Sequence, residues 1–425
     1  MFGVRRLAAH PYVRLAGNRP FAAFWVAQAI SLIGDRLNTI ALSVLVFGQT
    51  GSALLTGIVL TASLAPDLVI APFAGVLADR YDRRRLMVGA DLARAGLVAT
   101  LPFVVAVNPL LSLPITFAVG SLGLLFRPAK VAVIPRLVPP AQIEAATGAV
   151  WGADTVADFA GYPISAIVVG VLGLALLPIA FFLDAASYLV SAALLIRLPV
   201  GGKPPAPIDG PSLRREFLAG WRYLRGFPAL FENAILSAAV QATIGAYLAL
   251  FVVYAAQLLS GPLPYPANYP LLQLGFPVGN IIGVSLVVSL APRLARGRLI
   301  IGGFAAMSVL FAGFALVTDS AVAFGLIVAI GIANMIWLIP ASALIPEQTP
   351  SELIGRVSSL RSTIVHVGII AGMIVASLMA VFMPVATVFG LFGLFALVAT
   401  ALGATRAAIR QPPVVEPAAA ESAGA

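Results

Sequence analysis

Ionisable side chains inside long apolar stretches are the residues of this sequence whose types could do chemistry. The strongest candidates are five residues of the first half, Asp35, Arg36, Asp67, Asp154 and Asp158. An ionisable residue at the centre of a bilayer costs about 2.5–3.5 kcal/mol, so each is expected to have a function. Carboxyl groups in such surroundings bind and release protons or hold cations. The predicted chemistry is therefore reversible protonation or cation binding.

Asp35 is the first candidate to carry a transported proton. Burial disfavours the charged form of a carboxyl group, so Asp35 could hold a proton and release it when a cavity opens. Arg36 follows it in the chain, but neighbours on a helix point about 100° apart. Two interpretations stay open: Asp35 carries a proton, or Asp35 and Arg36 form structural ion pairs between helices.

Asp154 and Asp158 are four residues apart and share one face of a predicted helix. Two carboxylates at that spacing repel each other unless one is protonated or a cation lies between them. This pattern favours a proton relay or a cationic ligand. The alternative is a structural role, with Asp154 capping a helix or contacting Arg94 or Arg127. Asp184 is expected near the outer end of its helix.

The second half has no carboxylate inside an apolar segment, and its polar candidates are Gln241, Asn334 and His366. Proton coupling is therefore expected in the first half of the chain. A lone histidine in an apolar helix is typically a hydrogen-bonded packing residue. Asp35 and His366 together would suit a divalent cation, which keeps a metal site as the minority interpretation; no cofactor is expected.

The composition indicates an integral membrane protein. Of 425 residues, 60% are hydrophobic and 10% charged, against about 25% charged in soluble domains. The absence of cysteine excludes a disulfide framework, a thiolate metal site and a cysteine nucleophile. The sequence also lacks His-Glu-x-x-His, Gly-x-Ser-x-Gly and a phosphate loop, so no enzyme is predicted.

Twelve apolar segments are long enough to span a membrane. Of the 26 Lys and Arg residues, only Arg36 and Arg94 are predicted inside a span. The others, Arg127 and Lys130 among them, are predicted in cytoplasmic segments or at cytoplasmic span ends, so both termini should be cytoplasmic. The net charge of +9 then reflects membrane topology, and nucleic-acid binding is not predicted.

The chain divides into two predicted six-helix bundles. The expected boundaries are about 1–198 and 231–406, with a linker at 199–230 that holds an amphipathic helix and a disordered tail at 407–425. Five residues recur at one offset of 211 (345 − 134). They are Ala132, Ile134, Pro135, Pro139 and Ile143, matched by Ala343, Ile345, Pro346, Pro350 and Ile354. Since the repeat spans six helices, both bundles should insert with the same orientation.

A dense charged segment follows the second predicted span. It reads Gly75-Val-Leu-Ala-Asp79-Arg80-Tyr-Asp-Arg83-Arg84 and resembles the signature loop of the major facilitator superfamily, with Asp82 in place of the usual glycine. The resemblance implies twelve helices, an all-α membrane fold and a loop that gates the cytoplasmic side. Asp91 and Arg94 are expected to join Asp79 and Arg83 in a charge network that holds this side closed.

Further motifs narrow the resemblance. Gly34-Asp35-Arg36-Leu37, Phe126-Arg127-Pro128-Ala129, Trp221-Arg222-Tyr223-Leu224 and Gly355-Arg356-Val357 are similar to a facilitator subgroup with macrolide-efflux and siderophore-export proteins. Span four is expected to lack the mid-membrane arginine of many exporters.

This resemblance implies a bacterial inner-membrane exporter that exchanges protons for a lipophilic small molecule, acts as a monomer and works by alternating access. The alternatives are a ferroportin-like exporter of divalent metals and a lipid or lysolipid transporter or scramblase.

Overall fold

The protein is helical throughout the described part of the chain. The computed structural model describes residues 11–70, 81–200 and 213–406, and these residues contain no β-strand. Eleven of their helices are long and apolar enough to cross a membrane, and Ala53–Val69 is a shorter apolar stretch. The all-α membrane fold is thus confirmed. The second predicted span begins in Ala53–Val69, and its expected continuation lies outside the described residues.

Two compact units make up the chain. The first contains residues up to Ile208 together with Ala255–Gln257 and Pro262–Leu274, and the second contains the remainder. The short segment Pro262–Leu274 therefore packs with the first unit although it follows Pro228–Gln257, the opening helix of the second half. Its helix α13 (Asn268–Gln273) contacts α9 (Ile143–Leu176).

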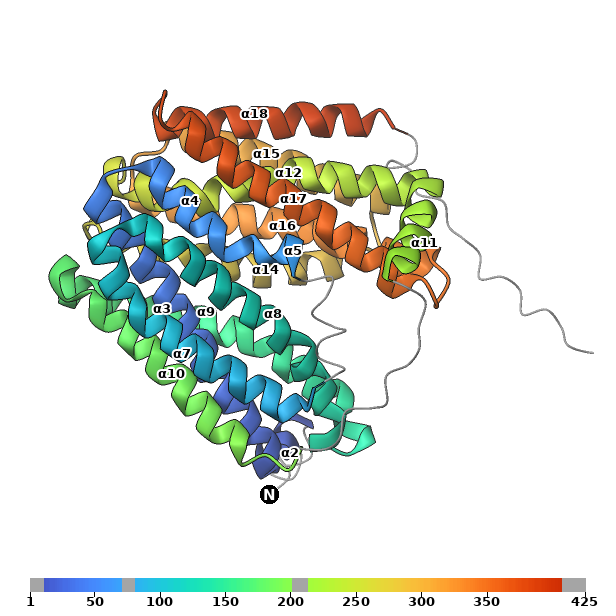
Figure 1. Cartoon of the computed structure of the whole chain (residues 1–425). Coiled ribbons are helices and arrows are strands. Elements are labelled where there is room, and N and C mark those ends of the chain that lie inside the picture. The colour runs from blue at the N-terminus through green and yellow to red at the C-terminus, as the bar shows by residue number, and fades with distance from the viewer. Residues whose placement is uncertain (1–10, 71–80, 201–212, 407–425) are drawn as a thin grey trace, which may run out of the picture. The chain divides into compact units, whose positions relative to one another are not determined.

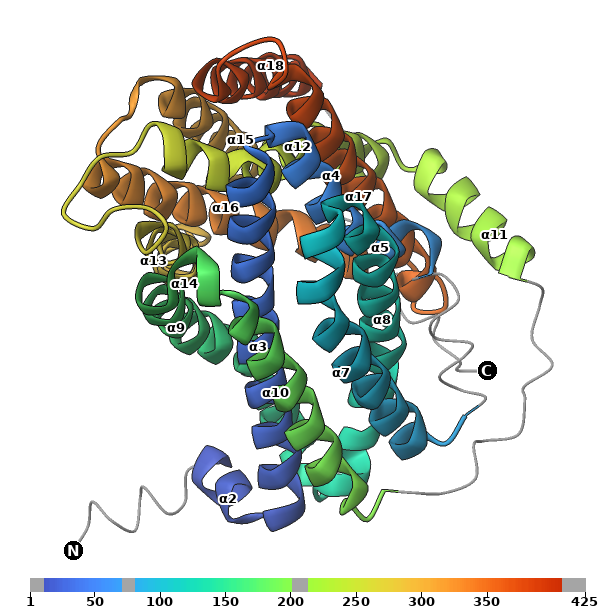
Figure 2. The same cartoon turned by 60° about the vertical axis from the view of Figure 1, so that its left-hand side comes forward.

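The first unit is a bundle around α3. Its helices are α2 (Pro11–Gly17), α3 (Arg19–Thr50), α4 (Ala53–Leu64), α5 (Pro66–Val69), α7 (Arg83–Val107), α8 (Ser112–Leu137), α9 and α10 (Pro178–Ile196). Helix α3 packs against α9 and α10, α10 against α7, and α7 against α8 (Figure 1; Figure 2). The helix that carries Asp35 and Arg36 therefore lies in the middle of its unit.

Two long-range hydrogen bonds fix the position of α3. Asn18 caps the helix and donates from Nδ2 to the Leu137 carbonyl oxygen at 2.8 Å, and Trp25 Nε1 donates to the Ala149 carbonyl oxygen at 2.8 Å. The side chains of Phe24 and Met87 are fully buried in an apolar cluster at the same end. Because buried polar groups and packed rings specify one arrangement, α3 is held in register with α8 and α9.

The second unit repeats the helix pairings of the first. Its helices are α11 (Leu213–Gly226), α12 (Pro228–Gln257), α14 (Gly275–Leu290), α15 (Arg296–Gly313), α16 (Ser320–Gln348), α17 (Ile354–Met379) and α18 (Val385–Ala404). The pairs α14–α16, α15–α16 and α15–α18 correspond to α4–α8, α7–α8 and α7–α10. Helices α8 and α16 also end at equivalent positions, since 348 − 137 = 211.

Close approach of helices is repeated as well. A Cβ atom on Gly120 of α8 would lie 2.6 Å from the Ser63 carbonyl oxygen of α4. The equivalent position in α16 is Gly331, where a Cβ atom would lie 3.0 Å from the Asn280 backbone nitrogen of α14. Only glycine permits such backbone contact. The internal repeat is therefore present in the packing as well as in the sequence.

The linker helix α11 packs against the second unit, and its predicted place along the membrane interface stays a prediction. Its Leu224 side chain is buried, and Tyr223 donates a hydrogen bond to the Gln348 carbonyl oxygen of α16. A Cβ atom on Gly220 would lie 3.1 Å from Arg356 Cβ of α17, whereas Phe217 is exposed. One side of the helix is thus attached to the second unit, and only part of its apolar surface is left for lipid.

Replacing Gly279 with alanine should destabilise the second unit. A Cβ atom there would lie 2.9 Å from the Gly331 Cα atom, and backbone cannot move aside as a flexible side chain can. Overpacking of this kind costs about 1–3 kcal/mol. Thermal unfolding in detergent should show a lower melting temperature for Gly279→Ala. The matched control is Gly302→Ala, where no atom lies within 4 Å; equal melting temperatures for the two variants would contradict the packing described.

Candidate functional site

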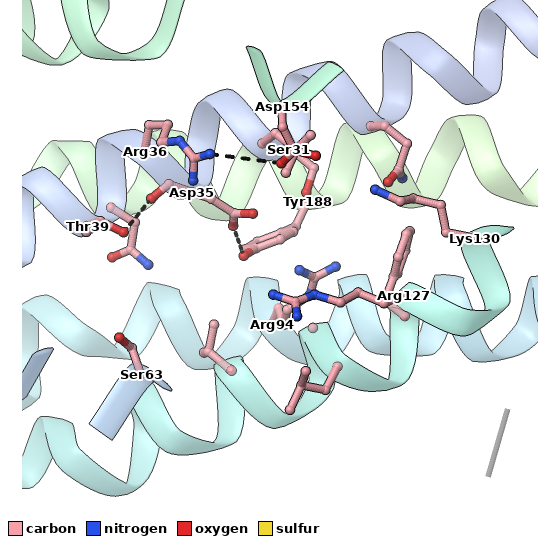
Figure 3. Close-up of a pocket in the computed structure, with 18 of the residues that line it drawn as sticks. Ser31, Asp35, Arg36, Thr39, Ser63, Arg94, Arg127, Lys130, Asp154 and Tyr188 are labelled. Atoms are coloured by element: carbon pink, nitrogen blue, oxygen red, sulfur yellow. Dashed lines mark hydrogen bonds and ion pairs between the residues drawn. The ribbon is translucent and has the colours of Figure 1, made fainter. Parts of the chain in front are cut away.

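The first unit encloses a cavity of about 750 Å³ between α3, α4, α7, α8, α9 and α10 (Figure 3). This volume is within the range of pockets for drug-sized ligands. Its wall is apolar in part, with Leu32, Leu64 and Val131 among the lining residues. Seven charged residues also line it: Asp35, Arg36, Asp67, Arg94, Arg127, Lys130 and Asp154.

Asp35 lies on the cavity wall with an uncharged hydrogen-bond donor as its partner. The Tyr188 hydroxyl of α10 donates to the Asp35 carboxylate (Figure 3). Among the described residues, no Lys, Arg or His nitrogen lies within 4 Å of that carboxylate. Arg36 points elsewhere, as the 100° rotation between neighbours requires. Among the described residues, Asp35 and Arg36 therefore do not form an ion pair with each other.

Arg36 is the cation that separates Asp154 from Asp158. Its Nε atom is 2.5 Å from Asp158 Oδ1, and its Nη2 atom is 3.9 Å from Asp154 Oδ1. Gly161 lets α9 approach, because a Cβ atom there would lie 2.9 Å from Arg36 Cβ. The repulsion between the two carboxylates is thus balanced by the chain's own guanidinium group, and this favours a structural link between α3 and α9 over an external cation.

Asp91 and Arg94 pair with each other inside the bundle. Both are buried; Arg94 donates to Asp91, and Ser191 Oγ donates to the other Asp91 oxygen at 2.7 Å. The Arg94 guanidinium also lies 4.4 Å from the centroid of the Tyr188 ring, a cation–π contact. A chain of contacts therefore joins this pair to the hydroxyl that binds Asp35.

The predicted cytoplasmic latch is described only in part. Gly75, Asp79 and Arg80 lie outside the described residues. Arg83 Nη1 donates to the Ala132 carbonyl oxygen at 3.2 Å, and Arg84 Nη1 donates to the Leu198 carbonyl oxygen at 3.2 Å. Arg83 thus binds α8 near its C-terminal end, and Arg84 binds the segment that follows α10.

Asp82, the residue in place of the usual glycine of the signature loop, caps α7 by accepting a hydrogen bond from the Arg85 backbone nitrogen. The described contacts of the Asp91–Arg94 pair are inside the bundle, so the expected network with Asp79 and Arg83 stays a prediction.

Arg127 and Lys130 lie on the cavity wall, although their sequence positions predict the cytoplasmic end of a span. Helix α8 continues through Pro128 and Pro135 to Leu137, which places both residues well inside it. Arg127 Nη1 lies 3.3 Å from Asp67 Oδ1, and its side chain is 68% exposed. Helix α8 thus brings an arginine and a lysine to the cavity wall. The spacing Gly120, Gly123, Arg127, Lys130 and Ile134 forms one helical stripe and could have revealed this.

Tyr188 and Trp151 are site residues without a clear signal in the sequence. Both line the cavity. Trp151 is 67% exposed, whereas Tyr188 is buried and contacts Asp35 through its hydroxyl group. Aromatic residues are common in apolar helices, and their type alone does not distinguish a cavity wall from a lipid-facing surface.

The candidates of the second half belong to the second unit, whereas the cavity is lined by the first. Asn334 Nδ2 donates to Asn280 Oδ1 at 3.5 Å, and His366 Nδ1 lies 2.8 Å from the Ser362 carbonyl oxygen of its own helix. Gln241 is half-buried. Among the described residues, no group of three or more His, Cys, Asp or Glu side chains could hold a metal ion.

Two curated proteins are similar to this chain over most of its length. Macrolide efflux protein A of Streptococcus pyogenes is 26% identical over 365 residues, which cover 85% of this chain and 89% of that protein. The enterobactin exporter EntS of Salmonella choleraesuis is 29% identical over 414 residues, which cover 93% of this chain and 95% of that protein.

A solved structure shares the fold. The nucleoside transporter NupG superposes with a TM-score of 0.75 at 13% identity, over 91% of this chain and 99% of that one. At this identity the likeness bears on the fold alone. The sequence profile of the Major Facilitator Superfamily matches residues 24–370. With its transmembrane helices, its repeated helix pairings and this match, the chain belongs to the major facilitator superfamily of membrane transporters.

Proposed function

We propose that this transporter exports a lipophilic small molecule in exchange for protons. Relatives named as macrolide and enterobactin exporters support the direction and the substrate class. The observation that carries the coupling is Asp35, a carboxyl group on a cavity wall with a neutral partner. The setting is a bacterial inner membrane, with a monomer in the lipid bilayer and both termini in the cytoplasm, as the Lys and Arg distribution favours.

The charge pattern of the wall supports Asp35 as the coupling group. Asp67 has Arg127 and Asp91 has Arg94, while Asp154 and Asp158 share Arg36. A carboxylate that already has a guanidinium partner is stabilised in its charged form. Asp35 has a hydroxyl partner instead and no cation within 4 Å among the described residues. Asp35 is therefore the carboxyl group of the wall that we assign to proton exchange.

The cavity surface suits an amphipathic substrate. Its apolar residues would contact a lipophilic scaffold, and the exposed Trp151 indole offers a stacking surface. Lys130 adds a polar group at the wall. Pockets for small molecules combine such apolar lining with a few polar groups that fix orientation.

The two similar units support alternating access. Parallel repeats of this kind alternate by rigid-body movement around a central substrate site. Each unit has its own helix pairings and its own close glycine contacts. Each can therefore move as a body while the contacts inside it are preserved.

The proposal is tested by flux in proteoliposomes. A thermal-stability screen with lipophilic cations, macrolides, siderophores, lipids and divalent metals first selects a ligand. Liposomes with an acidic lumen should then accumulate that ligand, because protons leaving down their gradient drive it inward. Protein-free liposomes are the control, since weak bases enter an acidic lumen unaided. Uptake that needs the protein but ignores the gradient would contradict antiport, and stabilisation by divalent metals alone would favour a metal exporter.

A further inference from the structure

A second carboxyl group lies behind Asp35, sealed from the cavity. Asp184 of α10 is completely buried. Its Oδ1 atom is 3.2 Å from Ser187 Oγ, and its Oδ2 atom has no hydrogen-bond partner among the described residues. Gly34 of α3 makes the space, because a Cβ atom there would overlap Asp184 Oδ1 and Ser187 Oγ. The carboxyl group therefore contacts α3 at the residue that precedes Asp35.

The charged and titratable groups around Asp184 come from three helices. Helix α3 contributes Asp35, α7 contributes Arg94 and its partner Asp91, and α10 contributes Tyr188. Within the described residues, no cationic nitrogen lies within 4 Å of the Asp184 carboxyl group. Arg94 is the cation that acts on it from farther away, and that guanidinium is already paired with Asp91.

The two carboxyl groups differ in their surroundings. Asp35 borders the cavity and accepts a hydrogen bond from Tyr188, whose ring lies against the Arg94 guanidinium. Asp184 is sealed from water beside a like charge, and ionisation there would leave an unpaired buried carboxylate. Asp184 is therefore a place where a proton that enters from the cavity through Asp35 can be held away from water.

We infer that Asp184 stores the exchanged proton and that Asp35 is the port through which this proton meets the cavity. This inference rests on the proton coupling proposed above. In the release step the O–H bond of the Asp184 carboxyl group breaks and an O–H bond forms on the Asp35 carboxylate. The negative charge moves to Asp184, where Arg94 is the nearest cation to stabilise it. The proton then leaves Asp35 for the cavity.

Proton release on substrate binding tests this assignment. Purified protein in weakly buffered detergent is titrated with the compound identified by flux, and a pH-sensitive dye records released protons. The wild type should release protons as the compound binds. Asp184→Asn should bind the compound and release none. Ser187→Ala, which removes the hydroxyl neighbour and keeps the carboxyl group, should release protons like the wild type.

Failure of this inference is distinguishable from failure of the proposed antiport. A wild type that binds the compound without releasing protons contradicts the coupling itself. If the wild type releases protons and Asp184→Asn releases as many per bound compound, only the assignment of Asp184 is overturned. If Asp184→Asn only lowers the melting temperature and leaves proton release unchanged, the assignment of Asp184 is also overturned. A purely structural residue would give that result.

Infrared difference spectra give a second readout if Asp184→Asn does not fold. A protonated carboxyl group has a carbonyl band that an ionised one lacks. In the wild type, substrate binding should remove such a band. Asp35→Asn at rest should still show it, because the stored proton is on Asp184. The inference is overturned if substrate binding does not remove the carbonyl band from the wild-type spectrum. It is also overturned if the resting spectrum of Asp35→Asn lacks this band.

Discussion

Asp35→Asn should reduce gradient-driven uptake to the level of protein-free liposomes while exchange of labelled for unlabelled substrate continues. Asparagine keeps the size of the side chain and an oxygen that accepts the Tyr188 hydrogen bond. It cannot take up a proton. Substrate binding and the movement of the two units are therefore preserved, and only the link to the proton gradient is lost. Both activities are measured in the same proteoliposome preparation.

Asp154→Asn is the matched control for this prediction. It is the same change on the same cavity wall, at a carboxylate 3.9 Å from Arg36. Arg36 keeps its closer partner Asp158, so gradient-driven uptake should stay near the wild-type level. Full uptake by Asp35→Asn, or equal loss in both variants, would show that coupling does not depend on Asp35 in particular.

Arg36→Gln should strongly destabilise the first unit. The substitution leaves Asp154 and Asp158 on one helix face without the cation between them. Removing one partner of a buried ion pair costs 3–5 kcal/mol in measured cases. About 3 kcal/mol is expected here, since 28% of the Arg36 side chain and 21% of the Asp158 side chain are exposed. Thermal unfolding in detergent measures the loss.

The double variant Arg36→Gln/Asp158→Asn tests the reason for that loss. It removes one of the two carboxylates that the missing cation would have balanced, so it should regain a large part of the lost stability. Asp158→Asn alone leaves Arg36 with Asp154 and should lie between the wild type and Arg36→Gln. An Arg36→Gln variant as stable as the wild type would show that this ion pair is not a structural link.

The fold could be predicted from the sequence because membrane insertion depends on local composition. Long apolar segments must form helices in lipid, and the Lys and Arg distribution orders them. The offset of 211 between Ile134 and Ile345 then predicted two like bundles. The span predicted at 113–136 is observed as α8, with Pro128 and Pro135 inside the helix. Proline often breaks helices in water, whereas neighbouring groups satisfy the freed backbone in a membrane.

The site was predicted as a set of residues but not as a set of contacts. Asp35, Arg36, Asp67 and Asp154 do line one cavity. Their partners lie 60 to 153 residues away, as in Arg127–Asp67 and Tyr188–Asp35. Which side chains meet depends on the rotation of each helix about its axis, and apolar composition all round a helix does not specify that rotation.

The depth of Asp184 in the bundle could not be predicted from the sequence either. Its position near the start of α10 predicts an outer aspartate, and its depth follows only from the glycine that faces it. The pairing of Asp91 with Arg94 on successive turns of one helix was readable from their spacing. The direction in which that pair points, toward Ser191 and Tyr188, was not.

Proton movement caused by substrate movement is the most direct test of coupling through Asp35. Proteoliposomes are loaded with substrate at equal pH inside and outside and then diluted into substrate-free buffer. Substrate leaving through the wild type should bring protons inward and acidify the lumen beyond the change seen in protein-free liposomes, and Asp35→Asn should show no such excess. Substrate efflux through the wild type without excess acidification, or equal acidification by Asp35→Asn, would contradict the mechanism.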